Sequence, residues 1–201
     1  SFDTMESDLH ALDAAGYDAM TIGNHEIDFG LYKFSELAST IKMPVLCANI
    51  IDNKTKTYLF KPYIIKTFAK TRIAIVGITA SNTFTALSDE EKQKITFLGT
   101  DEAYLKIRSE LKEKADIIIH LSHLGLPEDR EFAKKFPEVK LIIGAHSHTF
   151  LNEPEYIGKT CILNAGKFGD CLGKAKIKIV NNEIMSVDEQ LIYLKKTFLK
   201  K

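Results

Sequence analysis

The chain has 201 residues, of which 45% are hydrophobic and 27% charged, so it can bury a core of its own and is expected to form one domain rather than two. Lysine plus arginine and aspartate plus glutamate number 27 each, and this zero formal charge gives no sign of a basic face for polymeric nucleic acid. No apolar run approaches the roughly 20 residues that span a bilayer, so no membrane span is expected.

The first half of the chain alternates between helical and strand-like patterns. Residues 4–15 have helical spacing, with Thr4 as a possible N-cap and Gly16 as a stop. Residues 18–22 predict a strand that leads into a polar loop, 23–28. The elements expected after this loop are a helix at 30–39, a short buried strand at 45–48, a polar turn at 52–57 and a nearly all-apolar strand at 72–79. Residues 81–99 give no firm prediction.

The second half continues the alternation and predicts an α/β fold with a mostly buried sheet and additional antiparallel strands. The elements expected are an amphipathic helix at 101–115, a buried strand at 116–121, a short helix at 128–136 and a strand at 140–143. Residues 160–194 alternate as strands, with Asn181-Asn182 as the hairpin turn. The basic tail at 195–201 is expected to be a solvated end rather than a binding patch.

Polar side chains follow three of these predicted strands. They are Asn24, His25, Asp28, His123, His146 and His148. Because α/β folds place their chemistry at the carboxyl ends of strands, one shared site is the economical explanation. Histidine nitrogens bind mid-row divalent metals, an asparagine oxygen can join them, and paired metal ions are a recurring device for phosphoryl transfer. The residues therefore favour a metal-dependent phosphoesterase.

Three ordered segments resemble the calcineurin-like metallophosphoesterases, specifically their 5′-nucleotidase branch. They are GNHEIDFG at 23–30, LSHLG at 121–125 and GAHSHT at 144–149, and weaker matches extend the resemblance over nearly the whole chain. The resemblance implies a layered sandwich of mixed β-sheets flanked by helices. It also implies hydrolysis of the phosphate monoesters of nucleotides, with a small nucleotide or phosphate monoester as the substrate and no polymeric nucleic acid.

The resemblance also implies a set of metal ligands and two divalent ions in a complete site, manganese, zinc or similar. Asn24, His123 and His146 would bind the second metal, and His148 would bind the first. The alternative is that these histidines are ordinary core residues, as a lone histidine beside apolar sequence usually is. That alternative is weak here, because each of these histidines ends an apolar run and falls in a family motif. We expect His120, in contrast, to be a hydrogen-bonded core histidine rather than a ligand.

The catalytic roles implied by the resemblance fall on His25 and Asp28. His25 would stabilise charge on the phosphoryl group or protonate the leaving oxygen, oriented and kept protonated by Asp28, while a metal-bound hydroxide attacks phosphorus. Glu26, between them, is expected to be structural. Asp28 and Asn24 could also serve merely as caps of the loop and of the following helix. Asn49 ends a strand and either lines the site or forms a turn.

The family's leading Asp-x-His and Gly-Asp motifs, which supply the other first-metal ligands and a bridging aspartate, have no match. Asp8-Leu9-His10 lies in a helical pattern and is interpreted as surface, and Gly169-Asp170 matches a late glycine-rich segment instead. We therefore expect residues 1–201 to be a single, N-terminally incomplete catalytic domain missing its first strands. The nucleoside-recognising C-terminal domain is expected to be absent. The missing strands leave an open sheet edge, and a separate N-terminal fragment, a swapped neighbouring chain or disorder could each fill that place.

Two hypotheses of different classes stay open. One is a nucleotidase-like hydrolase, and the other is a non-catalytic binding module or inactive fragment that kept a partial metal site.

The three cysteines, Cys47, Cys161 and Cys171, are expected to be buried free thiols rather than to form a disulfide. The chain opens at Ser1 without a secretory signal, as a processed or truncated end would, so the localisation is unknown from the sequence, although the family suggests periplasm, cell surface or extracellular space.

Overall fold

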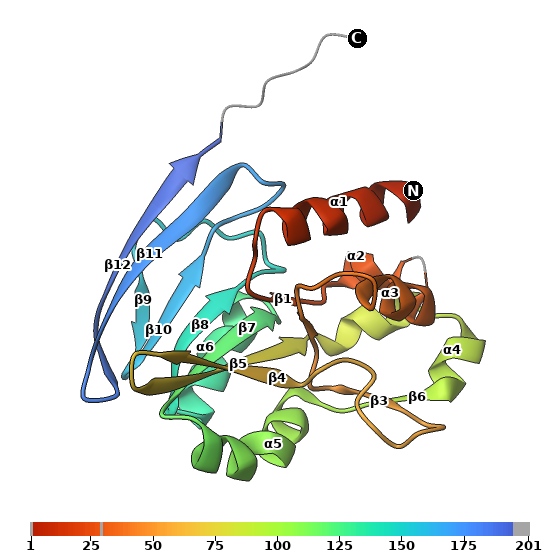
Figure 1. Cartoon of the computed structure of the whole chain (residues 1–201), viewed down its shortest axis with the longest axis horizontal. Coiled ribbons are helices and arrows are strands. Elements are labelled where there is room, and N and C mark those ends of the chain that lie inside the picture. Colours follow the sequence, from red (N-terminus) through yellow and green to blue (C-terminus); the bar gives the residue numbers. More distant parts are fainter. Residues whose placement is uncertain (1, 29, 195–201) are drawn as a thin grey trace, which may run out of the picture.

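A six-stranded mixed sheet forms the centre of the computed structural model, which describes residues 2–28 and 30–194 (Figure 1). In sheet order its strands are β4 (Tyr63–Phe68), β5 (Thr71–Thr79), β7 (Ile117–His123), β8 (Val139–Gly144), β10 (Thr160–Asn164) and β9 (Glu155–Ile157). The four inner strands run parallel, and β4 and β9 pair antiparallel at the two edges. The carboxyl ends of the parallel strands therefore meet along one edge of the sheet.

Two helices cover one face of this sheet, α5 (Thr100–Lys114) and α6 (Leu126–Lys135). The buried positions of α5 are Ala103, Tyr104, Ile107 and Leu111, a helical spacing that gives one apolar stripe. The Tyr104 ring lies edge-on to Phe132 of α6 with the ring centroids 5.2 Å apart. These rings join the apolar side chains of the inner strands in the largest core cluster of the described residues.

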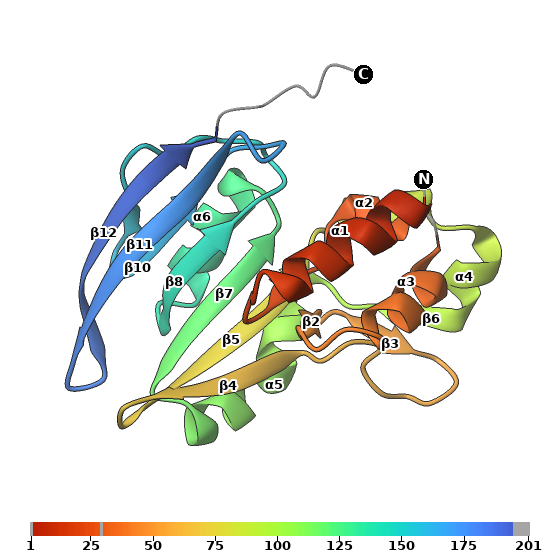
Figure 2. The ribbon, with the colours of Figure 1, turned by 45° about the horizontal axis from the view of Figure 1, so that its top comes forward.

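A second layer packs beside the sheet and has its own apolar cluster. It contains α1 (Phe2–Ala14), β1 (Met20–Thr21), α2 (Asn24–Ile27), α3 (Leu31–Ala38), β2 (Val45–Leu46), β3 (Ile50–Asp52), the 3-10 helix η1 (Ser81–Ala86), α4 (Asp89–Lys94) and β6 (Ile95–Phe97). In Figure 2, α1, α2 and α3 lie together on one side of this layer. Strand β1 pairs parallel with β2, and β3 pairs antiparallel with β6.

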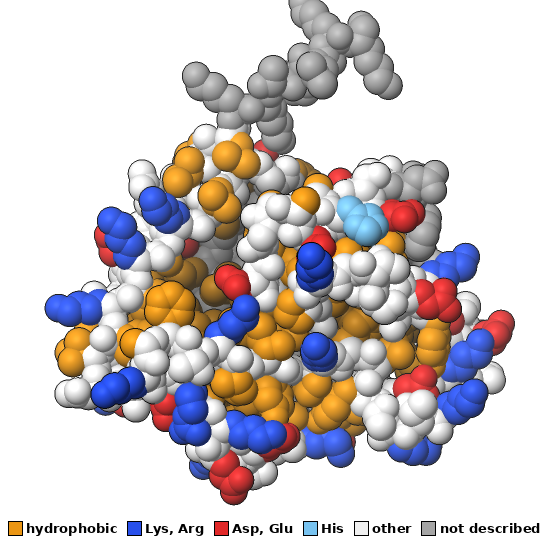
Figure 3. All heavy atoms as spheres, viewed as in Figure 1, with side chains coloured by type: hydrophobic (Ala, Val, Ile, Leu, Met, Phe, Trp, Pro, Cys, Tyr) orange, Lys and Arg blue, Asp and Glu red, His pale blue; other side chains and the backbone are white. Residues whose placement is uncertain are grey.

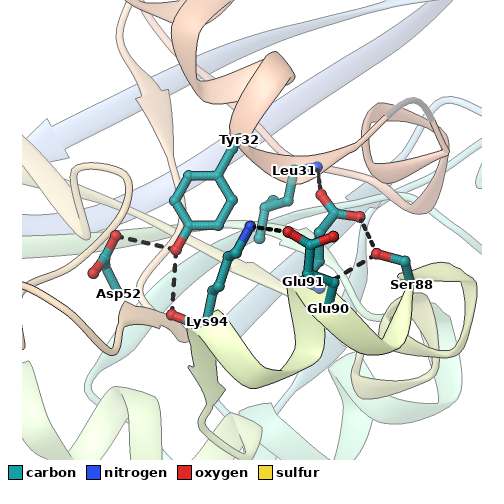
Figure 4. A network of polar contacts seen from close by, with 7 residues as sticks. All are labelled: Leu31, Tyr32, Asp52, Ser88, Glu90, Glu91 and Lys94. Atoms are coloured by element: carbon teal, nitrogen blue, oxygen red, sulfur yellow. Dashed lines mark hydrogen bonds and ion pairs between the residues drawn. The ribbon is translucent and has the colours of Figure 1, made fainter.

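The second layer meets the sheet at Gly77 of β5. The Ala48 amide donates to the Gly77 carbonyl at 2.7 Å, and a Cβ on Gly77 would lie 2.5 Å from the Leu46 carbonyl oxygen. Only glycine permits this approach. The Glu91 carboxylate of α4 in turn accepts the Leu31 amide at 2.8 Å, while the Tyr32 hydroxyl donates to the Lys94 carbonyl, so polar contacts join α3 to the 88–94 segment (Figure 4).

The chain ends in a long antiparallel hairpin of β11 (Cys171–Val180) and β12 (Glu183–Tyr193). Asn181 and Asn182 form its turn with φ angles of 52° and 62°, the left-handed pair that a tight hairpin turn requires. Apolar side chains of the hairpin pack against Leu141, Cys161 and Leu163 of the sheet. Figure 3 shows hydrophobic side chains over the hairpin and basic and acidic side chains intermingled on the same face of the molecule.

The α/β prediction and most of the predicted elements are confirmed, with three corrections. The 23–28 segment is not simply a loop, because residues from Asn24 to Ile27 form one helical turn, α2. Thr4 is not an N-cap, since it lies within α1. Residues 81–99, which gave no prediction, hold η1, α4 and β6. The three cysteines are buried and free, as expected, and the predicted solvated tail at 195–201 lies outside the described residues.

Candidate active site

The structure brings three of the predicted site residues together at the carboxyl ends of β1, β7 and β8. Asn24 opens α2 directly after β1, His123 is the last residue of β7, and His146 lies in the loop after β8. His123 Nε2 lies 2.9 Å from Asn24 Oδ1 and 3.2 Å from His146 Nδ1. Residues separated by up to 122 positions in the sequence thus direct their donor atoms at one another because three strand ends converge there.

The distances from His123 to the other two donor atoms are compatible with ligands that share one divalent metal ion. Ligand nitrogens and oxygens at about 2.1 Å from one ion, with angles between about 90° and 109°, lie about 3.0–3.4 Å apart. The observed 2.9 and 3.2 Å are close to that range. Among the described residues, no group of three or more His, Cys, Asp or Glu side chains could hold a metal ion by itself. The donor set is instead two imidazoles and one amide oxygen, a combination suited to mid-row divalent metals.

Electrostatics keep the central histidine in the form that can bind a metal. Burial, and then the charges of His146, His25 and His148, lower the pKa of His123 to about 4. Its imidazole is therefore neutral near pH 7 and has a lone pair to donate. His120 is also buried, and burial lowers its pKa to about 3. His120 is a buried core histidine as expected. The expected hydrogen bond is wrong, because neither of its ring nitrogens has a partner.

His25 and Asp28 form a pair beside the donor cluster. His25 Nδ1 lies 2.9 Å from Asp28 Oδ2, and the His25 side chain is 80% exposed. The neighbouring Asn24 side chain reaches His123 instead. Successive residues on a helical turn point in directions about 100° apart. Helix α2 therefore directs the Asn24 amide toward the cluster and the His25 imidazole toward solvent. A histidine held by a carboxylate at one nitrogen is equipped to hold or deliver a proton at the other.

The loop after β8 holds its two histidines in an unusual backbone conformation. His146 and His148 have φ angles of 70° and 57°, in the left-handed region that non-glycine residues seldom adopt. Ser147 between them accepts the Leu126 amide of α6 at 3.1 Å, which fastens the loop to the start of that helix. Such strain is concentrated at functional sites. His148 lies beside the cluster rather than in its hydrogen-bonded core, with its ring centroid 5.3 Å from that of Phe168.

Gly23 and Glu26 have structural roles around the cluster. Glu26 Oε2 accepts the Gly23 amide at 2.5 Å and so closes the start of α2. A Cβ on Gly23 would lie 2.6 Å from the His123 ring, so a larger residue would push that imidazole away. Burial raises the pKa of the Glu26 carboxyl. Asn49 is fully buried and donates to the Thr79 carbonyl at 2.7 Å, which joins the second layer to the end of β5.

Two residues near the site were not predicted from the sequence. Asn82 Nδ2 lies 3.4 Å from His146 Nε2, but Asn82 belongs to η1, in a stretch without a clear pattern. Asp129 lies beneath the strand ends, hydrogen-bonded to Ser122, the neighbour of His123. The sequence did contain a signal for Asp129, because it is the one acidic residue on the apolar face of the predicted helix. The other buried positions of α6 are Leu126, Phe132 and Ala133.

Comparison with known proteins identifies the family of this chain. Residues 5–150 match the family described as calcineurin-like phosphoesterase. The chain belongs to this family. It is 32% identical to protein UshA of Escherichia coli and 31% identical to a 5′-nucleotidase of Vibrio cholerae, each over 218 aligned residues that include 93% of the chain. It spans only 40% and 39% of the length of these two relatives.

Solved structures extend the likeness of fold. The Thermus thermophilus sulfate thiohydrolase SoxB superposes with a TM-score of 0.84 at 22% identity, over 94% of this chain and 35% of that one. A 5′-nucleotidase precursor from the same organism gives 0.81 at 23% identity, over 93% of this chain and 41% of that one. Both likenesses concern the fold alone. No helix among the described residues is long and apolar enough to cross a membrane.

Proposed function

We propose that this member of the calcineurin-like phosphoesterases is the catalytic unit of a 5′-nucleotidase-like hydrolase that acts on the phosphate monoesters of nucleotides. The observation that carries the proposal is the convergence of Asn24, His123 and His146, with the His25 and Asp28 pair directly beside them. The relatives named 5′-nucleotidase support the substrate class. They are aligned over 93% of this chain, but the chain covers only 39% of their length.

In this proposal Asn24, His123 and His146 hold one divalent metal ion. When bound, such an ion supplies positive charge to the phosphoryl oxygens and makes a water nucleophilic near neutral pH. The depressed pKa of His123 supports this assignment, because a neutral imidazole can donate its lone pair without first losing a proton. Gly23 leaves the space that the His123 ring needs in order to face the ion.

His25 is proposed as the general acid. Asp28 accepts a hydrogen bond from His25 Nδ1, which leaves Nε2 to hold a proton for the leaving oxygen. The exposed His25 side chain lies where an incoming ester can reach it. The assignment separates the two roles, because the lowered pKa of the half-buried His123 keeps that imidazole neutral for metal binding while His25 is the exposed imidazole that faces the ester.

His148 is proposed as a ligand of a first metal ion whose other ligands lie elsewhere. Strand β1 pairs with β2 in a two-stranded sheet, and its far edge offers backbone groups for another strand. A strand from another segment of the protein, paired at this edge, would lie near the end of β1, where Asn24 begins α2. In this part of the proposal residues 1–201 supply some of the ligands of a two-metal site. The alternative is a metal-binding module without turnover.

The experiment that tests the assignment separates binding from catalysis. The chain is loaded with excess zinc or manganese, desalted and analysed for metal, and hydrolysis of nucleoside monophosphates is measured in parallel. His146→Ala should lose the metal because one of three donors is removed. His25→Ala should keep the metal and lower turnover by about 100-fold or more, the usual contribution of a general acid.

His10→Ala is the matched control, since His10 is an exposed histidine on α1, paired with Glu6 rather than with the cluster. It should change neither readout. Loss of metal from His25→Ala would refute the separation of catalyst from ligand. Tight metal binding without hydrolysis in the unmodified chain would favour the binding-module alternative.

A further inference from the structure

A completely buried carboxyl group lies beneath the candidate site and has no role in the mechanism above. Asp129, in the first turn of α6, is 0% exposed, and its Oδ2 has no hydrogen-bond partner. Burying a polar atom without a partner costs free energy, and an apolar residue would pack at this helix position without that cost. Stability alone therefore does not account for an acid here.

Asp129 ends a chain of hydrogen bonds that encloses His123. The Ser122 hydroxyl donates to Asp129 Oδ1, and its oxygen accepts the Leu124 amide at 3.1 Å. Because Ser122 and Leu124 are the two neighbours of His123, this hydroxyl fixes the backbone on both sides of a proposed metal ligand. A hydroxyl that donates to a carboxyl becomes a better acceptor, since linked hydrogen bonds polarise one another. Asp129 thereby strengthens the contact that sets the direction of His123.

The same carboxyl group also lies against the end of β8, the strand that leads to His146. A Cβ on Gly144 would lie 2.5 Å from Asp129 Oδ2, so a glycine is needed where the carboxyl approaches this strand end. Gly144 is two positions before His146. The Asp129 amide donates to the Gly125 carbonyl at 2.9 Å, which holds the residue at the start of α6. Asp129 therefore supports the ends of both strands that carry the histidine donors.

We propose that Asp129 is a positioning residue for the metal site, which acts through Ser122 to hold the His123 imidazole where a shared ion requires it. The inference rests on the proposed function, since it concerns the ligands of the proposed metal ion. The distances of 2.9 and 3.2 Å from His123 Nε2 to the other two donors depend on where the end of β7 lies. Ligands that are fixed before the ion arrives lose little conformational entropy on binding, so their support determines the affinity.

The test measures zinc affinity and ligand geometry in variants of Asp129 and Ser122. Zinc dissociation constants are obtained by competition with a chromophoric chelator, and the visible absorption bands of the cobalt(II)-loaded chain report how the ligands are arranged. Asp129→Ala and Ser122→Ala should each weaken zinc binding about tenfold or more, the usual cost of removing a support behind metal ligands, and should shift the cobalt bands. The double variant should lose little more than either single variant, because both changes break one chain of hydrogen bonds.

A conservative variant and a matched control separate positioning from a general loss of stability. Asp129→Asn keeps an oxygen that accepts the Ser122 hydroxyl, so it should bind zinc within about twofold of the unmodified chain. Thr160→Val is the control, because the Thr160 hydroxyl is buried and donates to the Val139 carbonyl at 2.7 Å. These two residues begin β10 and β8, at the opposite ends of the strands from the site. The control should leave the zinc affinity and the cobalt bands unchanged.

Three outcomes would overturn the inference, and each is distinct. Unchanged zinc affinity in Asp129→Ala and Ser122→Ala, with a lower free energy of urea unfolding, would give the pair a structural role only. An equal loss of affinity in Thr160→Val would trace the effect to stability. Failure of the unmodified chain to bind zinc would refute the proposed metal site itself and this inference with it. Ser122→Ala, which removes a single oxygen, decides the question if Asp129→Ala does not fold.

Discussion

Replacement of Asp129 by asparagine should change how the stability of the fold depends on pH. The Asp129 side chain is completely buried, its Oδ1 contacts the Ser122 hydroxyl, and its Oδ2 has no hydrogen-bond partner. Burial raises the pKa of this carboxyl to about 7, against the opposing effect of the Ser122 hydrogen bond, and the charge of Glu128 adds to the rise. Asparagine keeps the shape and the hydrogen-bonding capacity but cannot ionise.

The magnitude follows from the pKa difference between the folded and unfolded states. A rise from 3.8 to about 7 is about three units, or roughly 4 kcal/mol at about 1.4 kcal/mol per unit. Between pH 4 and 7 the folded protein retains a proton that the unfolded chain has released, so this residue lowers stability progressively as the pH rises through that window. Above about pH 7 both states are ionised and the full cost is present.

His120 acts in the opposite direction over much of the same range. Its pKa falls from 6.5 to about 3 in the fold, so between these values the unfolded chain binds the extra proton and stability rises with pH. The pKa of His123 also falls, to about 4, so both histidines oppose Asp129 between about pH 4 and 6.5, and the Asp129 contribution offsets part of their rise. Asp129→Asn removes only the falling contribution and exposes the full rise due to the two histidines.

The assay is urea unfolding of the unmodified chain and of Asp129→Asn at several pH values between 4.5 and 7.5. The free energy of unfolding of the variant should increase relative to the unmodified chain as the pH rises, by about 2–4 kcal/mol over the window. Asp188→Asn, at an exposed position of β12, is the control and should run parallel to the unmodified chain. A difference between Asp129→Asn and the unmodified chain that stays constant with pH would refute the reasoning.

Two further substitutions test the packing around the site. His120→Leu should raise the free energy of unfolding at pH 7 by about 1 kcal/mol or more, because it removes two buried ring nitrogens without partners; a loss in urea unfolding would mean that they are hydrogen-bonded. Gly77→Ala should lower it by about 1–3 kcal/mol, since the new Cβ would meet the Leu46 carbonyl at 2.5 Å. An unchanged melting temperature for Gly77→Ala would show that the second layer is not packed tightly on β5.

The sequence predicted the central elements because their patterns are long and apolar. Strands β7 and β8 contain runs such as Ile117-Ile118-Ile119 that only a buried strand explains well. Helix α4 gave no such signal. It is six residues long and has no buried residue, and its place is fixed by contacts such as that of Glu91 with the Leu31 amide, 60 positions away. Local periodicity carries no information about a contact of that kind.

The donor cluster was predictable for a related reason, whereas its surroundings were not. Histidines that end apolar runs must lie at strand ends, so the grouping of His123 with His146 follows once the strands are parallel neighbours. Asn82 and Phe168 come to the site through a 3-10 helix and a strained turn, whose paths depend on tertiary contacts. The direction of a loop side chain is not encoded in hydrophobic spacing.

The contrast between Asp8-Leu9-His10 and the 24–28 segment shows how local geometry decides which polar residues can share a ligand. On α1, residues two positions apart differ by about 200° around the helix axis, so Asp8 and His10 point to different sides while Leu9 faces the core. The same letters on a strand would point to one side. On α2, the angle of about 100° between adjacent residues directs Asn24 to His123 and His25 to Asp28. The residue type indicates which side chains can act as ligands, and the periodicity of the backbone determines whether two of them point to the same side and can bind one ion.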